Sequence, residues 1–205
     1  MTDLSTSRVQ PCPAVRLVAF ARFPVAGMCK TRLIPSVGAR GAAAIHKRLV
    51  EKCVAAMRNS GLAAELRITG GDAAAFGAWL GDDIAFVDQG GGDLGDRLAR
   101  ATDRAPVIVI GSDAPDLDAA RLTAAADALR DAPAVIGPAE DGGYYLLGIN
   151  NPAPWLFTDI AWGSEIVFDQ TMRRFAAYGI TARVLEPLAD LDRPEDLARW
   201  PDLIP

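Results

Sequence analysis

Residues 106–117 read Pro-Val-Ile-Val-Ile-Gly-Ser-Asp-Ala-Pro-Asp-Leu, and this stretch decides the fold class. The run from Val107 to Ile110 is β-branched throughout, which is typical of a strand buried on both faces of a parallel sheet. Asp113 follows directly and is expected beyond the carboxyl end of that strand, where ligands bind in open α/β sheets. The stretch therefore predicts a central strand that brings a carboxylate to the edge of a sheet.

Further apolar runs precede and follow this strand, and they alternate with segments of helical periodicity. The spacing predicts strands over Arg16–Ala21, Glu65–Thr69, Ile84–Val87, Pro106–Ile110 and Ala134–Gly137. A long irregular loop from Arg22 leads to a predicted helix around 45–57, with Gly61 as its C-cap. Further helices are predicted over Ala73–Leu80, Asp93–Ala101 and 118–130. Asp93 and Asp96 have the spacing of a capping box, and Asp118 that of an N-cap. Alternation with short connections predicts an α/β fold with a mostly parallel sheet and right-handed crossovers.

The pattern changes in the last third of the chain. An extended piece is expected over Tyr144–Gly148, a helix over Ser164–Tyr178, a strand over Thr181–Leu185 and a final helix over Pro194–Trp200. No repeat, low-complexity tract or linker interrupts the chain, so one domain is expected over residues 15–205. Residues 1–14 are polar with two prolines, and they are expected to form a loose tail rather than a signal peptide.

Charge is distributed unevenly along the 205 residues, which carry a formal net charge of −5. The first sixty residues hold ten Lys or Arg against only Asp3 and Glu51, whereas the remainder is strongly acidic. With a pI near 4.9 the protein is a poor candidate for non-specific binding to nucleic acid or an anionic membrane. The asymmetry favours a phosphate-binding segment facing a carboxylate-held metal, with chance clustering of surface charge as the alternative.

Cysteine, histidine and apolar content restrict the function further. Three cysteines without a Cys-x-x-Cys pair argue against a disulfide framework or structural zinc and for a reducing compartment. No apolar run approaches the ~20 residues needed to span a bilayer, so we expect a cytoplasmic protein. The only histidine, His46, is expected on a helix surface or half-buried, without a catalytic role.

The loop after the first strand, residues 22–33, is too long for a simple turn. It carries Arg22, Lys30 and Arg32, and these cations suit a phosphate. The loop lacks the glycine pattern of a P-loop or a dinucleotide fingerprint. A solvated basic surface is the alternative to a phosphate site.

A second loop, Gln89-Gly-Gly-Gly-Asp-Leu-Gly95, follows the third predicted strand. Glycines before a helix let the backbone approach a flat ligand such as a nucleobase or a ribose. The same composition is common in ordinary mobile turns, so both interpretations stay open.

Acids gather in three later loops. Asp113 is placed to hold Mg²⁺ or Mn²⁺ against a diphosphate, and Asp116 suits a turn or helix cap. Glu140-Asp141 precede two glycines and two tyrosines, which suggests a general base or metal ligand beside a polar substrate. Asp192 precedes a Pro-started helix as a possible N-cap, which leaves Asp190 free to reach a metal.

Six motifs in order resemble a family of small bacterial transferases: 30–33, 89–97, 111–117, 137–148, 162–164 and 190–197. The family is the radical-SAM/selenodomain-associated, or arsenosugar-biosynthesis-type, glycosyltransferases. The resemblance covers about residues 15–200. It implies the nucleotide-diphospho-sugar transferase (GT-A) fold, a Rossmann-like three-layer sandwich with a mostly parallel mixed sheet. Lys30–Leu33 also resembles phospholactate guanylyltransferases, and Asp190–Leu197 the molybdopterin-cofactor nucleotidyltransferases. Met28, Ala114 and Arg193 depart from the usual pattern.

Site roles follow from the resemblance, residue by residue. It implies that Lys30, Arg32 and more weakly Arg22 bind nucleotide phosphates, and that Asp113 with Asp190 or Asp192 holds Mg²⁺ or Mn²⁺. It further implies that Asp141 is the general base. The remaining roles are a base or ribose site at Gln89, Gly91 and Gly92, and an acceptor pocket shaped by Tyr144 and Trp162.

Three functions remain open. A metal-dependent glycosyltransferase would move a sugar from a nucleotide-diphosphate donor to a small acceptor, and the Glu140-Asp141 pair favours it because a hydroxyl acceptor needs a base. A nucleotidyltransferase would use an NTP and a phosphorylated acceptor and release pyrophosphate, and Lys30 with Arg32 favours it. A non-catalytic nucleotide-binding module is the third possibility. In each case the partners are small molecules rather than nucleic acid or membrane, and the oligomeric state is left open.

Overall fold

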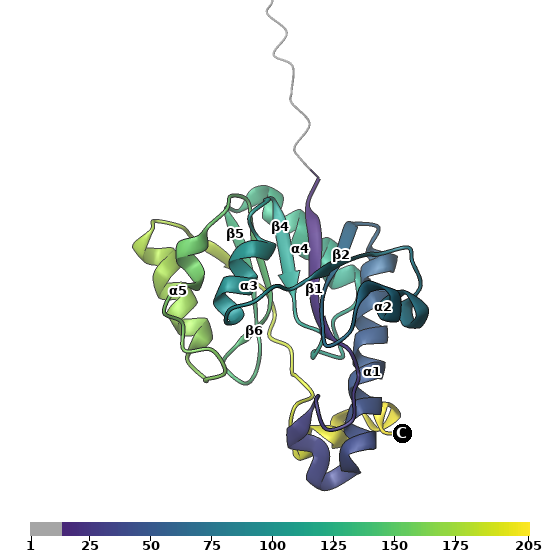
Figure 1. The fold of residues 1–205 in the computed structure, drawn as a ribbon. Coiled ribbons are helices and arrows are strands. Elements are labelled where there is room, and N and C mark those ends of the chain that lie inside the picture. Colours follow the sequence, from purple (N-terminus) through teal and green to yellow (C-terminus); the bar gives the residue numbers. More distant parts are fainter. Residues whose placement is uncertain (1–13) are drawn as a thin grey trace, which may run out of the picture.

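The computed structural model describes residues 14–205, and residues 1–13, most of the expected N-terminal tail, lie outside the described part. Within residues 14–205, seven strands form one sheet in the order β3-β2-β1-β4-β6-β5-β7 (Figure 1). The strands are β1 (Arg16–Arg22), β2 (Ala63–Thr69), β3 (Ala85–Asp88), β4 (Val107–Ile110), β5 (Ala134–Pro138), β6 (Tyr144–Ile149) and β7 (Ala182–Val184). Only β6 runs antiparallel to its neighbours. The predicted α/β fold with a mostly parallel mixed sheet is confirmed.

Strand β4 occupies the centre of the sheet and is buried at every residue, as its sequence predicts. Its side chains alternate between the two faces, with Ile108 and Ile110 in one core cluster and Val107 and Val109 in the other. In parallel strands the carboxyl ends lie on one edge, so the segments after β1, β2, β3 and β4 meet there. This edge faces downward in Figure 1.

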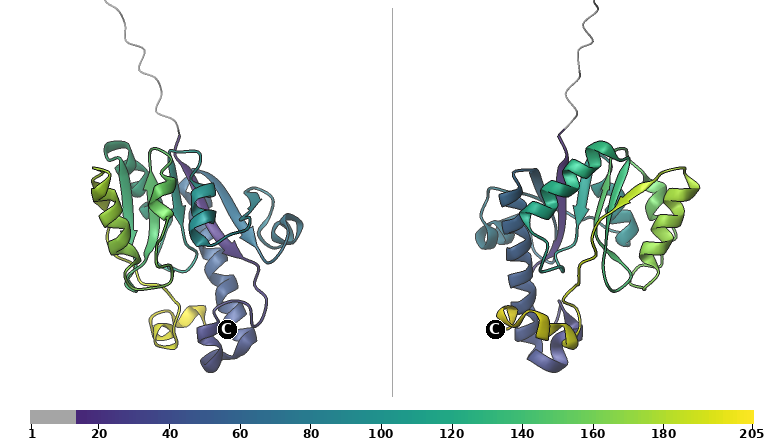
Figure 2. Two further views of the ribbon diagram at one scale, coloured as in Figure 1. Left: turned by 60° about the vertical axis from the view of Figure 1, so that its left-hand side comes forward. Right: turned by 180° about the vertical axis from the view of Figure 1, so that it is seen from behind.

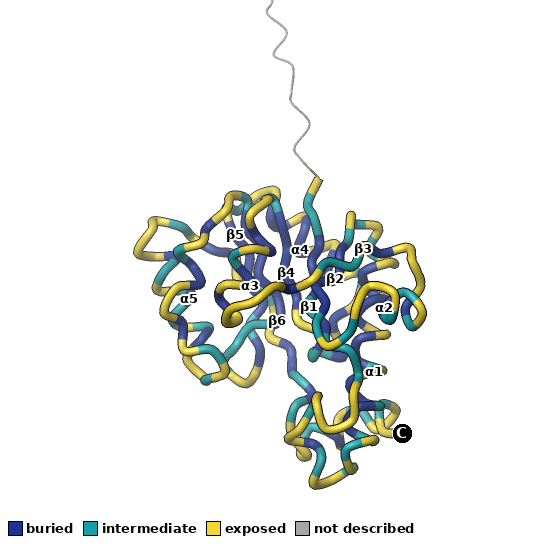
Figure 3. The backbone as a smooth tube through the Cα atoms, in the orientation of Figure 1, coloured by how far each residue is buried: buried dark blue, intermediate teal, exposed yellow. Residues whose placement is uncertain are grey.

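Helices cover both faces and complete three layers (Figure 2). On one face α1 (Ile34–Ser60), α2 (Ala73–Leu80) and α4 (Ala119–Asp131) pack over the larger core cluster. On the other lie α3 (Leu94–Ala101), the 3-10 turn η2 (Pro154–Phe157) and α5 (Val167–Ala177). Figure 3 shows the buried sheet enclosed between these more exposed helices. Among the described residues, no helix is long and apolar enough to cross a membrane.

Several helix ends follow the predicted chemistry. The Asp93–Asp96 capping box opens α3, Asp118 caps α4, and Gly61 ends α1 in a left-handed conformation (φ 69°). The two largest errors in the predicted boundaries are at helix starts. Helix α1 begins at Ile34, inside the predicted loop, with a break at Gly38 (φ 72°), and α5 begins at Val167 rather than Ser164.

The last segment contains the predicted final helix. It is a 3-10 helix, η3 (Pro194–Arg199), followed by a second one, η4 (Pro201–Leu203). They pack on the first turns of α1 in a separate apolar cluster that includes Leu33, Ile45, Leu191 and Trp200. This projecting lobe lies below the carboxyl edge of the sheet in Figure 1, and it joins the start of α1 to the C-terminal segment.

Candidate functional site

A cavity of about 330 Å³ lies at the carboxyl ends of β1 and β4. Three cations, Arg22, Lys30 and Arg97, line it together with the acids Asp113 and Asp192; we call it the cationic cavity. Arg22 ends β1 and Asp113 follows β4, and the pairing of these two strands brings both residues to the same edge. The position agrees with the predicted binding edge of the sheet.

Lys30 lies at the centre of the charges in this cavity. Its backbone is left-handed (φ 46°, ψ 44°), which is uncommon for a residue other than glycine. Its buried ammonium lies 2.7 Å from Oδ1 of Asp113 and 3.0 Å from Oδ1 of Asp192. Burial alone would lower the pKa of Lys30, but the two carboxylates outweigh it and raise that pKa. In turn, although Asp113 is partly buried, the Lys30 ammonium holds the pKa of Asp113 below its usual range. The two groups therefore persist as an ion pair.

Arg32 lies apart from Lys30, although both belong to the predicted phosphate loop. Its exposed guanidinium donates to Oδ2 of Asp192 at 2.8 Å and lines a different cavity. Asp192 thus bridges the two cations. It does not cap the last helix as suggested, because its carboxylate is engaged with them, and Asp196 accepts from the backbone N–H groups of Asp192 and Arg193.

The predicted base or ribose site divides into a buried amide and an exposed loop. Gln89 lines the cationic cavity, but its side-chain amide donates to the carbonyls of Ala21 (3.1 Å) and Arg67 (3.0 Å). Gly91 and Gly92 are exposed and are not among the residues lining the three cavities described in this section. The Gln89 amide thus joins β1 to β2 and fixes the start of the glycine loop.

Arg97 is the functional candidate that sequence reasoning missed. Its guanidinium donates to Oε1 of Gln89 at 3.1 Å and to the Gly92 carbonyl at 3.2 Å, and it lines the cationic cavity. Its position in the sequence could have indicated this role, because Arg97 lies four residues after the N-cap Asp93, in the first helical turn that follows the glycine loop. Arg97 is therefore the third cation of the cationic cavity, in the place that was predicted for Arg32.

His46 is buried, contrary to the predicted surface or half-buried position. Its Nε2 lies 2.9 Å from the carbonyl oxygen of Arg22, and burial lowers its pKa. The neutral ring of His46 thus fastens α1 to the end of β1 beneath the cationic cavity.

A second cavity, of about 210 Å³, adjoins the first and shares Phe20 and Leu94 with it. We call it the apolar cavity, because aromatic and aliphatic side chains form most of its wall. Tyr144 and Trp162 line it with their rings edge to face, 6.4 Å between centroids. Among the described residues, the predicted base Asp141 is the only charged side chain in its lining.

A third cavity, of about 670 Å³, is acidic and adjoins the other two through Asp141 and Asp192. Asp190 lies in it without a cationic partner among the described residues. Burial, together with the charges of Asp141 and Asp113, raises the pKa of Asp190 to about 7. Glu140, by contrast, forms a two-pronged ion pair with Arg199 at 2.7 and 3.2 Å. Of the predicted Glu140-Asp141 pair, only Asp141 is thus available to a substrate.

The acids predicted to hold a metal suit Mg²⁺ or Mn²⁺ in chemical type. Within residues 14–205, no three His, Cys, Asp or Glu side chains form a closed metal site. Hard cations of this kind need only one or two protein carboxylates when substrate phosphates supply the other ligands. Asp113 and Asp190 offer such oxygens, and a cation would relieve the repulsion that raises the pKa of Asp190. The residues therefore fit an open metal site completed by substrate.

Solved structures define the class to which this fold belongs. The chain is 31% identical to a protein from Desulfovibrio desulfuricans G20 that is provisionally named a nucleotide-diphospho-sugar transferase, with a TM-score of 0.82 over 92% of this chain and 87% of that one. A nucleotidyl transferase from Methanothermobacter has the same fold at 16% identity (TM-score 0.58, covering 93% and 97%). So does Rv0371c from Mycobacterium tuberculosis H37Rv, crystallised with manganese, at 18% identity (TM-score 0.52, covering 91% and 97%). The fold is that of the nucleotide-diphospho-sugar transferases and nucleotidyltransferases.

A family model narrows this class to one family. Residues 51–164 match the family described as uncharacterized protein conserved in bacteria, DUF2064. The chain belongs to this family. No functionally curated protein matches the sequence. Family and fold leave the reaction itself open.

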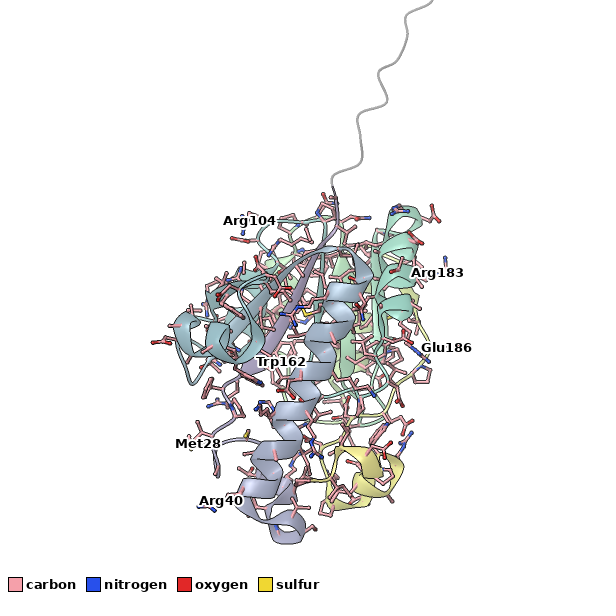
Figure 4. The ribbon with its side chains drawn as sticks, turned by 90° about the vertical axis from the view of Figure 1, so that its right-hand side faces the viewer. Met28, Arg40, Arg104, Trp162, Arg183 and Glu186 are labelled. Carbon is pink, nitrogen blue, oxygen red and sulfur yellow. The ribbon has the colours of Figure 1, made fainter. Side chains whose placement is uncertain are left out.

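Figure 4 shows Met28, which lines the cationic cavity, at the opposite end of the molecule from Arg104.

Proposed function

We propose that the protein is a metal-dependent glycosyltransferase that moves a sugar from a nucleotide-diphosphate donor to the hydroxyl of a small acceptor. The observation that carries the proposal is the junction of two unlike cavities. The cationic cavity suits a diphosphate, and the apolar cavity beside it presents the carboxylate of Asp141 and no cation among its described lining residues. A phosphorylated acceptor would find no counter-charge there, whereas a hydroxyl acceptor would find a base.

In this proposal the cations Arg22, Lys30 and Arg97 bind the donor diphosphate, which carries the negative charge that their cavity favours. Bound Mg²⁺ or Mn²⁺, held by Asp113 with Asp190 or Asp192, would offset charge on the departing diphosphate. Gln89, which lines the same cavity, would lie beside the base or ribose, whereas Gly91 and Gly92 line none of the three cavities.

Asp141 acts on the acceptor. One of its oxygens accepts from the Gly143 backbone N–H at 2.9 Å, which orients the carboxylate at the edge of the apolar cavity. The carboxylate takes the acceptor hydroxyl proton as the oxygen bonds to the anomeric carbon. The bond from that carbon to the diphosphate breaks, and the nucleoside diphosphate leaves.

Nucleotidyl transfer is the second candidate, because three cations around one cavity also suit a triphosphate. Thermal shifts with UDP- and GDP-sugars against NTPs, each with and without Mn²⁺, separate the two. A ligand at a hundredfold excess over its Kd stabilises the fold by about 2.7 kcal/mol, which is readily measured. We expect manganese-dependent stabilisation by nucleotide sugars. Preference for an NTP, followed by pyrophosphate release with a phosphorylated acceptor, would establish the second candidate instead.

A further inference from the structure

We infer that the apolar cavity binds an uncharged, ring-sized alcohol with one or two hydroxyls, such as a phenol or a cyclic alcohol. Calling this occupant the acceptor rests on the proposed function. Its size, charge and hydrogen-bonding capacity are argued from the cavity itself.

Size sets the first limit on the occupant. The cavity holds about 210 Å³, and a protein cavity of about 150 Å³ accommodates benzene. One substituted ring therefore fills the space. Its walls are the aromatic rings of Phe20, Tyr144 and Trp162 with the aliphatic side chains of Leu98 and Val109. Such walls favour a flat or chair-shaped apolar body, because aromatic side chains contribute large contact areas.

Charge sets the second limit. None of the described residues that line this cavity is Lys, Arg or His, and Asp141 is its only charged side chain. The neighbouring acidic cavity adds Asp190 and Glu165 on the far side of Asp141. An anionic group in the apolar cavity would lose its hydration and face a carboxylate without a partner cation. The occupant is therefore neutral.

Hydrogen-bonding capacity separates a simple ring alcohol from a sugar. The polar side chains in the lining are Asp141, Ser164, Trp162 and the two tyrosines, and Ser164 and Tyr145 are already engaged. Ser164 donates to the Ala161 carbonyl at 2.6 Å, and Tyr145 donates to the Glu186 carbonyl at 3.1 Å. A hexose would bring several hydroxyls into a site that satisfies only one or two of them, and each unpaired buried hydroxyl is costly.

The carboxylate of Asp141 marks where the occupant's hydroxyl would bind. The Tyr144 hydroxyl is buried without a partner among the described residues and is closed off from the cavity space, so its ring and not its oxygen faces an occupant. One Asp141 oxygen accepts from the Gly143 backbone N–H at 2.9 Å, which leaves the other oxygen to accept from the alcohol. We assign the alcohol's hydrogen bond to that second oxygen.

Fluorine NMR with four probes tests the assignment: 4-fluorophenol, fluorobenzene, 4-fluorophenyl phosphate and 2-deoxy-2-fluoroglucose. We expect 4-fluorophenol to bind best and the phosphate and the sugar to bind about tenfold or more weakly. Asp141→Asn should weaken 4-fluorophenol about three- to tenfold, because a neutral amide oxygen accepts a hydrogen bond less strongly than a carboxylate, and it should leave fluorobenzene unchanged. Asp127→Asn, at an exposed carboxylate paired with Arg130, is the matched control and should change neither.

A cavity-filling variant locates the binding. Gly111 lines the apolar cavity, and a Cβ added there meets no atom within 4 Å. Gly111→Leu should therefore fold, which its melting temperature checks, and should abolish 4-fluorophenol binding. Equal or tighter binding of the phosphate or the sugar, or 4-fluorophenol binding that survives Gly111→Leu, would overturn the inference.

Titrating UDP-sugars and GDP-sugars with Mn²⁺ into the same samples keeps the two proposals distinguishable. If 4-fluorophenol behaves as expected and no nucleotide sugar binds, the glycosyltransferase proposal fails and the ring-alcohol site stands. If nucleotide sugars bind and 4-fluorophenol does not, the assignment of the cavity fails and the proposed donor site stands.

Discussion

The ammonium of Lys30 and the carboxylate of Asp113 lie 2.7 Å apart, although 83 residues separate them in the sequence. The pair joins the loop after β1 to the loop after β4. It also contacts Asp192 from the C-terminal segment, so three distant parts of the chain meet at one buried ammonium. The predictions below begin with this contact.

Lys30→Met should lower the free energy of unfolding by about 1–3 kcal/mol, because it leaves Asp113 without its cation and Asp192 with Arg32 alone. Since the Asp113 side chain is half exposed, the loss should stay below that of a fully buried pair. Urea unfolding measures it. Arg130→Met is the control, because it removes an exposed pair with Asp127 and should change stability by less than about 1 kcal/mol. Equal losses in the two variants would mean that burial of the Lys30 pair has no special effect.

The same Lys30→Met variant should bind Mn²⁺ about tenfold more tightly in the absence of nucleotide, because the competing ammonium is gone. Electron paramagnetic resonance of free Mn²⁺ measures this directly. Lys47→Met, on the exposed side of α1 beside Glu51, should leave the affinity unchanged. Unchanged or weaker Mn²⁺ binding in Lys30→Met would argue against a metal at Asp113.

Arg97→Gln should weaken binding of inorganic pyrophosphate with Mn²⁺ about tenfold or more, because a charge-assisted contact in the cationic cavity is lost. Isothermal titration calorimetry measures the change. Arg104→Gln, an exposed arginine at the other end of the molecule, is the matched control (Figure 4). If both variants bind pyrophosphate like the unmodified protein, Arg97 has no role in phosphate binding.

Gly142→Ala should destabilise the fold by about 2 kcal/mol or more, because a Cβ there would lie 2.0 Å from the Glu165 carbonyl oxygen and the backbone φ is +89°. Thermal unfolding measures the loss. Gly27→Ala isolates the conformational part, since Gly27 also has a positive φ (+81°) but open space around it, and its cost should stay near 1–2 kcal/mol. A smaller loss at Gly142 than at Gly27 would mean that the loop carrying Asp141 relaxes freely.

The sheet was predictable because its strands are short, apolar and β-branched, so periodicity and burial act together in β4. The capping box of α3 and the glycine cap of α1 were predictable because their signals are local. The start of α1 was not, because Pro35, Gly38 and Gly41 are poor signs of a helix. There the lobe packing of Leu33 and Ile45 against Leu191 overrides local preference.

The candidate site was also partly predictable from the sequence. The strand-end rule placed Asp113, Lys30 and Arg22 correctly at one edge, because it depends only on topology. The rule could not predict that Lys30 and Arg32 line different cavities. Lys30 is the N-cap of the 3-10 turn Thr31–Leu33 and Arg32 lies inside it, and neighbouring residues of such a turn can point in different directions. It also missed Arg97, whose approach depends on a hydrogen bond to the side chain of Gln89.

The projecting lobe has a consequence for the order in which the protein becomes complete. Lys30 is translated 162 positions before its partner Asp192, which lies beside the packing residue Leu191. A growing chain can therefore form most of its sheet while the cationic cavity still lacks one wall. Ligand-binding competence should then appear only once residues 191 and 192 have packed into the lobe, as a step distinct from formation of the core.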